Sequence, residues 1–474
     1  MHTARLKKLV KDLRHHDSAK RRYAAEALSE GDERAVYPLI KALRDENFGV
    51  QDAAIRSLME IKGESTAYML LPLLRENAFL RNTAIMIIKE IGREAVPLLV
   101  PLLRDRDDDV RKFALDLIQD IRYCDYPEKL VELLRNDPNP NVRAAAAKAL
   151  GALKYRPAEP HLMDALKDEE WVCFSAIEAL TDLGGDGCLR SIEALLDSPS
   201  EAIRFAALEA LGKIGSPMSV KPLVEHISRS DGYEKNAAIK SLVRTGDVPS
   251  IPGMSDSLVE ILREGEWEDR LTAIKGLVAI KETSAIPHMI DIAGSYDTSV
   301  PDNEEKVSII KEAVKSLDCN EHLLNILNDR SMKFRGRSIA VDIIGDLKCS
   351  EAVPALIELL NDECRDVKRS AVNSLGKAGG DEVKESLIDM INEHDSHVRK
   401  TAVISLGKIR EEAAFEPLMK FLHNEKYHDV IREFIKALLN INPSVFLSRI
   451  HEYSDYVREI AAEYVSDIKT GDSC

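Results

Sequence analysis

The chain has few of the features that catalysis or cofactor binding usually needs, and their absence excludes several classes of protein. Aromatic residues make up only 5% of the 474 residues, and the cysteines include no CxxC pair. The spacings GxGxxG, GxxxxGK[ST], GxSxG and HExxH do not occur, so no phosphate-binding loop, hydrolase nucleophile or zinc-protease helix is predicted. No apolar run approaches the roughly 18 residues of a membrane span. The sequence therefore predicts a non-enzymatic protein without cofactor, metal or membrane segment.

Charge and cysteine content narrow the class further. Lys and Arg number 65 against 81 Asp and Glu, a formal net charge of −16, which disfavours a nucleic-acid partner because proteins that coat nucleic acid usually carry the opposite sign. The cysteines are odd in number and widely spaced, as is typical of reduced thiols: Cys124, Cys173, Cys188, Cys319, Cys349, Cys364 and Cys474. Arg5, Lys7 and Lys11 interrupt the apolar residues near the start, so we expect no secretory signal and a cytoplasmic protein.

The chain contains a sequence motif that recurs about every 31 residues. Clear copies occupy residues 142–151, 203–212 and 398–407, each beginning with Val or Ile followed by Arg and ending in Leu-Gly. We call the first residue of each copy its anchor. The anchors are Lys20, Val50, Leu80, Val110, Val142, Val172, Ile203, Glu234, Asp269, Ile309, Gly336, Val367, Val398, Val430 and Val457. Such a period predicts a solenoid of about 15 stacked helical hairpins.

Each repeat has the apolar spacing of two helices. The anchor, a small residue four positions later and an aliphatic residue eight positions later share one side of a helix, as Val142, Ala146 and Leu150 do. We call this helix B, and the amphipathic helix that precedes it A. No alternating strand pattern competes with these helices, so the predicted fold is all-α.

A glycine follows the last core position of several B helices. Because glycine has no Cβ, it suits the left-handed residue that often ends a helix. We therefore predict left-handed caps at Gly151, Gly212, Gly345, Gly376 and Gly407.

Charged residues also keep a fixed register. A basic residue follows the anchor in eleven of the fifteen copies, and an acid often stands six residues before that base, as Asp105 precedes Arg111 and Asp137 precedes Arg143. Such acids lie in the turn between helices A and B. We expect them to cap helix B and to bridge to the next layer, with a structural role.

The A helix at residues 95–105 has the form AVPxLxxLLxD, and the B helix at residues 203–215 the form VRxxAAxALGxIG. In these motifs the chain resembles the HEAT repeat superfamily, in the short bacterial and archaeal form also seen in phycobilin lyase subunits. The resemblance covers about residues 6–468. It implies a right-handed α-α superhelix whose B helices line a concave face, and a family that mostly binds proteins.

The repeat is disturbed between Glu234 and Gly336. We predict regular repeats over 1–240, distorted repeats with longer loops over 241–330, and regular repeats over 331–474, within one continuous solenoid. The expected loops are residues 246–253, which include Pro249 and Pro252, and residues 294–305. Two interpretations stay open, a tolerated insertion and a functional loop.

The position two after the anchor points away from the core side of helix B and is polar in most copies. Phe174, Phe205 and Leu271 are exceptions, with Ala144 beside them. We predict that they form an apolar strip that anchors a partner helix or peptide. The alternative is that superhelical twist buries both phenyl rings between layers.

Two polar clusters accompany the strip. A basic stripe of Lys368, Arg369, Arg399, Lys400, Arg432 and Lys436 would suit an acidic peptide, a phosphorylated tail or, less well, nucleic acid. Histidines in successive turns would either converge on a metal or a pH-sensitive patch, or be unrelated surface residues: His394, His397, His423, His428 and His451.

The leading hypothesis is a protein-protein interaction scaffold or adaptor that binds a protein or peptide on the concave face. A first alternative, from the resemblance alone, is a phycobilin-lyase-like chaperone or lyase subunit. A second is nucleic-acid binding through the basic stripe.

Overall fold

The computed structural model describes residues 2–471, with side chains for all of these except residue 381 and residues 466–471. Within that range the chain forms helices and no strands. Thirty α-helices pair into hairpins of an A and a B helix, with odd-numbered A helices and even-numbered B helices, and every anchor lies in a B helix. The predicted all-α solenoid is confirmed.

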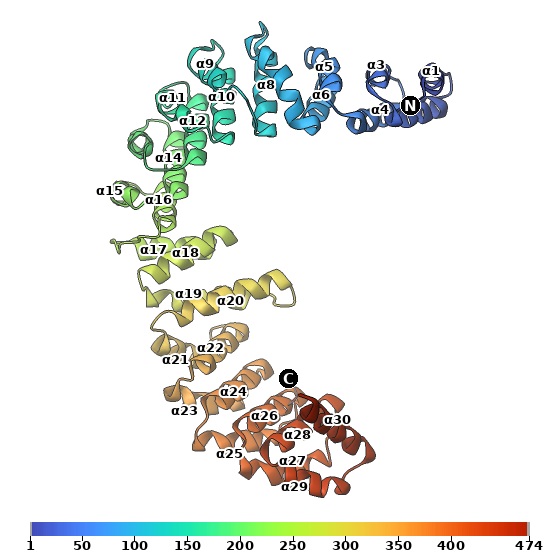
Figure 1. Cartoon of the computed structure of the whole chain (residues 1–474). Helices are drawn as coiled ribbons and strands as arrows, with labels where there is room; N and C mark the ends of the chain where they lie inside the picture. The colour runs from blue at the N-terminus through green and yellow to red at the C-terminus, as the bar shows by residue number, and fades with distance from the viewer. Residues whose placement is uncertain (1, 472–474) are drawn as a thin grey trace. The chain divides into compact units, whose positions relative to one another are not determined.

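The chain divides into two compact units, Met1–Asp247 and Val248–Cys474. Within each unit the A helices form one layer and the B helices a second, which follows the inner side of that unit's own bend (Figure 1). The division falls inside the predicted loop at residues 246–253, which contains no helical residue; α17 begins directly after it.

Unit 1 contains eight hairpins. Its A helices are α1 (Thr3–Asp12), α3 (Glu33–Ala42), α5 (Glu64–Leu70), α7 (Val96–Leu99), α9 (Glu128–Asn136), α11 (Glu159–Ala165), α13 (Leu189–Glu193) and α15 (Val220–Arg229). Its B helices are α2 (Ser18–Ala27), α4 (Phe48–Ile61), α6 (Ala78–Ile91), α8 (Asp108–Ile121), α10 (Pro140–Ala152), α12 (Glu170–Leu183), α14 (Glu201–Ile214) and α16 (Gly232–Arg244).

Unit 2 contains the other seven hairpins. Its A helices are α17 (Met254–Glu264), α19 (Ile286–Ser295), α21 (Asn320–Asn328), α23 (Val353–Glu358), α25 (Asp381–Asp389), α27 (Phe415–Leu422) and α29 (Pro443–Arg449). Its B helices are α18 (Trp267–Ala279), α20 (Pro301–Lys315), α22 (Phe334–Leu347), α24 (Arg365–Ala378), α26 (Ser396–Ile409), α28 (His428–Ile441) and α30 (Asp455–Gly471).

Glycines inside the B helices allow neighbouring B helices to pack backbone against backbone. A Cβ on Gly212 would lie 2.8 Å from the Cα of Ser241 on the next B helix, and one on Gly151 would lie 2.7 Å from the Cα of Ala179. Gly345, Gly376 and Gly407 make equivalent contacts. The prediction that these five glycines are left-handed caps is wrong, because all five lie within helices and none has a positive φ.

The left-handed residue that ends a B helix lies twelve residues after the anchor. It is found in eleven hairpins, at Lys62, Gly92, Arg122, Lys154, Gly184, Gly215, Gly246, Lys281, Lys348, Gly379 and Arg410. Wherever it is not glycine it is Lys or Arg. A cation suits this place because the last carbonyls of a helix carry partial negative charge.

Ion pairs at the turns link one hairpin to the next along each unit, and we call this series the arginine ladder. The base after the anchor binds an acid of the following hairpin at 2.6–3.0 Å, in the pairs Arg21–Asp45, Arg111–Asp137, Arg143–Asp168, Arg204–Glu234, Arg337–Asp362, Lys368–Glu393 and Arg399–Glu425. Meanwhile the guanidinium of Arg143 donates to the backbone carbonyl of Asp137, six residues earlier. The predicted bridge between layers is confirmed. Asp137 contributes its carbonyl to Arg143 of its own hairpin, and its carboxylate binds Arg111 of the preceding hairpin.

The hairpin of α19 and α20 departs from this regular packing. Helix α20 begins at Pro301, so the predicted loop at 294–305 is reduced to residues 296–300. A Cβ on Gly294 would lie 2.7 Å from the backbone nitrogen of Gly336, so A helix α19 packs directly on B helix α22. Helix α22 consequently packs more extensively against α19 and α24 than against α20. A pocket of about 640 Å³ opens between α20, α22 and α24.

Six cysteines, all except Cys474, which lies outside the described residues, are free. Burial raises the pKa of the Cys173 thiol on α12 to about 11, which makes it a poor nucleophile. In the described part of the chain, no helix combines the length and apolarity needed to cross a membrane.

Candidate protein-binding surface

The predicted apolar strip occupies equivalent positions on neighbouring B helices of unit 1. Phe174 on α12 is 36% exposed, whereas Phe205 on α14 and Ala144 on α10 are half-buried. Neither ring is buried between layers, so the alternative of complete burial does not hold for them. Adjacent helices pack roughly 8–10 Å apart, which brings the two rings within reach of a single partner segment.

Trp171 extends this surface and was missed from the sequence. It lies on α12 three residues before Phe174, hence nearly one turn away on a neighbouring line of the helix, and is 53% exposed. The signal that could have revealed it is the position just before the anchor, where Phe79 and Tyr233 are also exposed.

Leu271 does not lie in the same unit as Phe174, Phe205 and Ala144. It lies on α18 of unit 2 and is half-buried. It therefore stays a prediction separate from the strip on α10, α12 and α14.

The predicted basic stripe lies on α24, α26 and α28 and separates into two groups. Lys368 and Arg399 belong to the arginine ladder, and their side chains are only 22% and 15% exposed. The other four, Arg369, Lys400, Arg432 and Lys436, are at positions that face away from the core. Three of these four form ion pairs: Arg369–Asp366 at 3.6 Å, Lys400–Asp429 at 3.0 Å and Lys436–Glu433 at 2.9 Å. A hydrogen bond with Tyr456 raises the pKa of Arg432. Local acids thus offset much of the stripe's charge.

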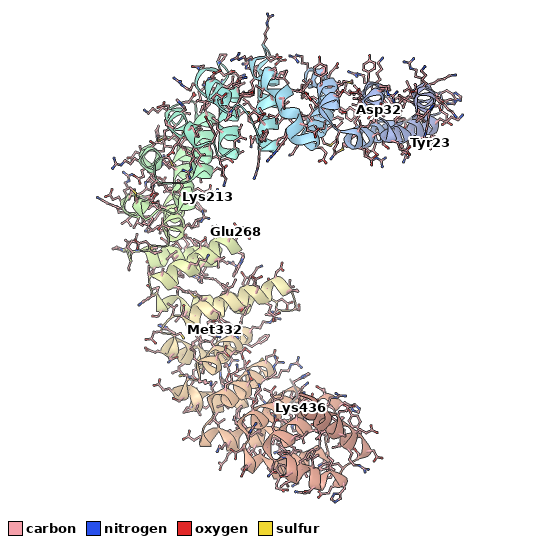
Figure 2. All side chains as sticks on the ribbon, viewed as in Figure 1. Tyr23, Asp32, Lys213, Glu268, Met332 and Lys436 are labelled. Carbon is pink, nitrogen blue, oxygen red and sulfur yellow. The ribbon has the colours of Figure 1, made fainter. Side chains whose placement is uncertain are left out.

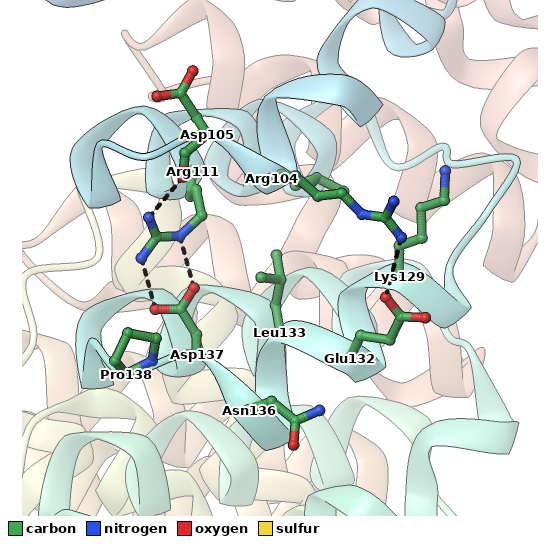
Figure 3. Close-up of a pocket in the computed structure, with 10 residues that line it drawn as sticks. Arg104, Asp105, Arg111, Lys129, Glu132, Leu133, Asn136, Asp137 and Pro138 are labelled. Carbon is green, nitrogen blue, oxygen red and sulfur yellow. Dashed lines mark hydrogen bonds and ion pairs between the residues drawn. The ribbon is translucent and has the colours of Figure 1, made fainter.

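A groove between the fourth and fifth hairpins of unit 1 has a volume of about 440 Å³ (Figure 3). Its polar walls are the ladder pair Arg111–Asp137 at 2.7 Å and the pair Arg104–Glu132 at 3.7 Å. The groove lies beside the arginine ladder, and the charges in its walls neutralise one another in pairs. It therefore presents no activated nucleophile or base.

The pocket beside α20 includes a residue of the predicted basic stripe in its lining. It is lined by Arg369 of the basic stripe, together with Lys311, Arg335 and Asp342. Lys311 and Asp342 pair across it at 3.6 Å. Mixed charges of this kind suit a polar protein segment better than a single anion.

The turn histidines do not gather around a metal. His423 stacks on Tyr453 at 4.2 Å, and His428 meets the edge of Tyr456 at 4.7 Å. Across the residues for which side chains are described, no three His, Cys, Asp or Glu side chains are placed to hold a metal ion. The two histidines are instead packed against aromatic rings.

Comparison with known families agrees with the stacked hairpins, the glycine contacts and the arginine ladder. A family model described as HEAT repeats matches residues 6–89, 127–187, 172–243, 320–396 and 381–439, which together exceed half of the chain. The chain belongs to the HEAT repeat family. This family match does not distinguish a phycobilin-lyase-like subtype. No curated protein sequence matches the chain.

The solved structures that match the chain include Kap95p and the karyopherin Kap121p. A structure of Kap95p binding RanGDP has a TM-score of 0.53 and 14% identity, and covers 94% of this chain and 75% of that one. A structure of Kap121p bound to RanGTP has a TM-score of 0.48 and 15% identity, and covers 96% of this chain. The chain spans 54% of the length of Kap121p. At these identities the likeness to Kap95p shows the solenoid fold alone.

Proposed function

We propose that this HEAT repeat chain is a non-enzymatic scaffold or adaptor that binds a protein or peptide on the concave side, along its B helices. The observation that carries the proposal is the exposure of Phe174, at a position where most hairpins have a polar residue. Apolar rings at equivalent positions on adjacent helices, as in Phe174 and Phe205, offer a contact surface for a partner segment, because burying them on binding removes apolar surface from water.

Unit 1 supplies the apolar contacts in this proposal, through Phe174 and Phe205. In unit 2 we propose that Arg369, Lys400, Arg432 and Lys436 add charge complementarity, while Lys368 and Arg399 support the surface from the ladder. Leu271 is retained as a contact of unit 2. The free thiols suit a reducing compartment, in keeping with action in the cytoplasm.

The test is affinity capture with the full chain and with two double variants. Phe174→Asp plus Phe205→Asp places charges in the strip, and Phe48→Asp plus Phe79→Asp is the matched control, since those rings are 82% and 44% exposed on α4 and α6. We expect one partner, in fixed stoichiometry, that the first variant loses and the control retains.

Equal capture by both double variants would contradict the proposal, provided that far-UV circular dichroism shows both to be folded. The same proteins also test the two alternatives. Bilin absorbance on titration would indicate the lyase-like function, and a salt-sensitive shift of DNA or RNA mobility would indicate nucleic-acid binding.

A further inference from the structure

Three aromatic side chains of unit 1, the exposed Trp171 and Phe174 and the half-buried Phe205, form a patch across two adjacent B helices. Trp171 and Phe174 lie nearly one turn apart on α12, and Phe205 occupies the position on α14 that corresponds to Phe174. A cluster of one indole and two phenyl rings offers apolar area with few rotatable bonds, so ordering it on binding costs little conformational entropy.

Acidic residues border this patch. On α10, α12 and α14 the acids are Glu170, Glu178, Asp182, Glu201 and Glu209, and the bases outside the arginine ladder are Lys148 and Lys213. Glu178 follows Phe174 by four residues and Glu209 follows Phe205 by four, so each ring has a carboxylate one turn away on the same face. Acids therefore outnumber the bases outside the ladder on these three helices, whereas in the adjoining pocket Glu178 and Asp182 lie beside Lys89, Arg122, Lys148 and Lys154.

Two of these five acids form ion pairs, and two have no ion-pair partner in the described part of the chain. Glu209 pairs with Lys213, labelled in Figure 2, at 2.9 Å, and Glu178 pairs with Lys148 at 3.7 Å. Asp182 and Glu201 have no ion-pair partner within 4 Å among the side chains described. Arg143 and Arg204 do not compensate, because they bind Asp168 and Glu234 in the ladder.

The backbone hydrogen bonding of α12 and α14 favours a helical partner over an extended one. The amide and carbonyl groups of α12 and α14 are used within the helices, so the patch has no free sheet edge for an extended peptide to join. A helix satisfies its own backbone hydrogen bonds and needs only side-chain contacts. Positions seven residues apart on such a helix are roughly 10.5 Å apart, which matches the spacing of roughly 8–10 Å between adjacent B helices.

We propose that unit 1 binds a cationic amphipathic helix, whose apolar residues contact Trp171, Phe174 and Phe205 and whose Lys and Arg residues face the acids beside them. This inference rests on the proposed function and specifies the chemistry of the partner segment that contacts unit 1. An acidic segment or a nucleic acid would be repelled by Asp182 and Glu201.

Tryptophan fluorescence tests the proposal directly, because the chain contains only Trp171 and Trp267. In the full chain with Trp267→Phe, Trp171 is the only reporter, and the new ring can still face Tyr296. The probes are two synthetic peptides of equal length with leucine at helical spacing, one with lysine and the other with glutamate at the remaining positions. At physiological ionic strength we expect a saturable blue shift of Trp171 emission with the lysine peptide and none with the glutamate peptide.

A pair of charge variants separates the patch from general attraction to an acidic chain. The rim variant carries Glu178→Gln, Asp182→Asn and Glu201→Gln. The control variant removes the same charge from exposed acids at or just before the starts of A helices, with Glu33→Gln, Glu64→Gln and Glu94→Gln. We expect affinity for the lysine peptide to fall at least about tenfold in the rim variant and to stay within about twofold in the control.

Equal losses in the two variants, or a shift with the glutamate peptide, would overturn the inference. A dimer that sedimentation detects in the parent and not in the rim variant would also overturn it, by showing that a second copy occupies the patch. If capture in the preceding experiment still depends on Phe174 and Phe205, the proposed function stands although this inference fails. If neither experiment shows binding, both fail.

Discussion

Removing the carboxylate of Asp137 should destabilise unit 1 by about 3–5 kcal/mol. Asp137 accepts hydrogen bonds from Nε and Nη2 of Arg111 at 2.7 and 2.9 Å, and from the backbone nitrogen of Asn139 at 2.9 Å. The Arg111 and Asp137 side chains are only 10% and 3% exposed. In Asp137→Ala the guanidinium would keep its charge with little water to replace the carboxylate. Two charge-assisted bonds at roughly 1.5–3 kcal/mol each lead to a similar total.

The matched control is Asp52→Ala on α4. Asp52 binds Arg56 at 2.8 Å, but these side chains are 65% and 59% exposed, so the control should change stability by less than about 1 kcal/mol. Repeat arrays open locally, so we would measure hydrogen exchange of α8 and α10 beside urea unfolding followed by circular dichroism. Similar exchange in the two variants would refute the reasoning. Arg111→Met added to Asp137→Ala should recover part of the loss, because no buried charge then remains.

Two further predictions concern the ladder and the glycine contacts. The hydrogen bond from Arg143 holds the pKa of Asp168 below its usual value of 3.8, so the stabilisation is complete above that value and is lost as the pH falls through the lowered pKa. The difference in thermal midpoint between the parent and Asp168→Asn should therefore shrink between about pH 5 and about pH 2, and a constant difference would contradict the assignment. Gly212→Ala should lower stability by about 1–3 kcal/mol, because its Cβ would lie 2.8 Å from the Cα of Ser241. Helix propensity alone predicts a gain of about 1 kcal/mol, so the sign of the change in unfolding free energy decides between the two effects.

The candidate surface was only partly predictable. Phe174 could be proposed because its position points away from the core side of one helix, and this follows from helix geometry alone. Phe205 has the same register but is less exposed, because its neighbours in space determine how much of the ring they cover. Trp171 was missed for the same reason, since the position before an anchor is exposed or covered according to the packing at the turn.

The basic stripe shows a similar limit. Register correctly places Arg369 and Lys400 two positions after their anchors, but it does not show that Asp366 and Asp429 lie close enough to pair with them. Distances of this kind depend on rotamers and on the next hairpin, which the linear pattern does not contain.

The sequence by itself determined the hairpins, because a period of about 31 residues with apolar residues on one side of each helix can bury that side only by stacking. Tertiary structure decided the roles of individual residues within the stack. Gly212 is a contact glycine and not a cap, and Arg111 binds Asp137 of the next hairpin, because both roles depend on the distance between neighbouring hairpins. Such distances are set by the packing of neighbouring helices, and the linear spacing of residues along the chain does not contain them.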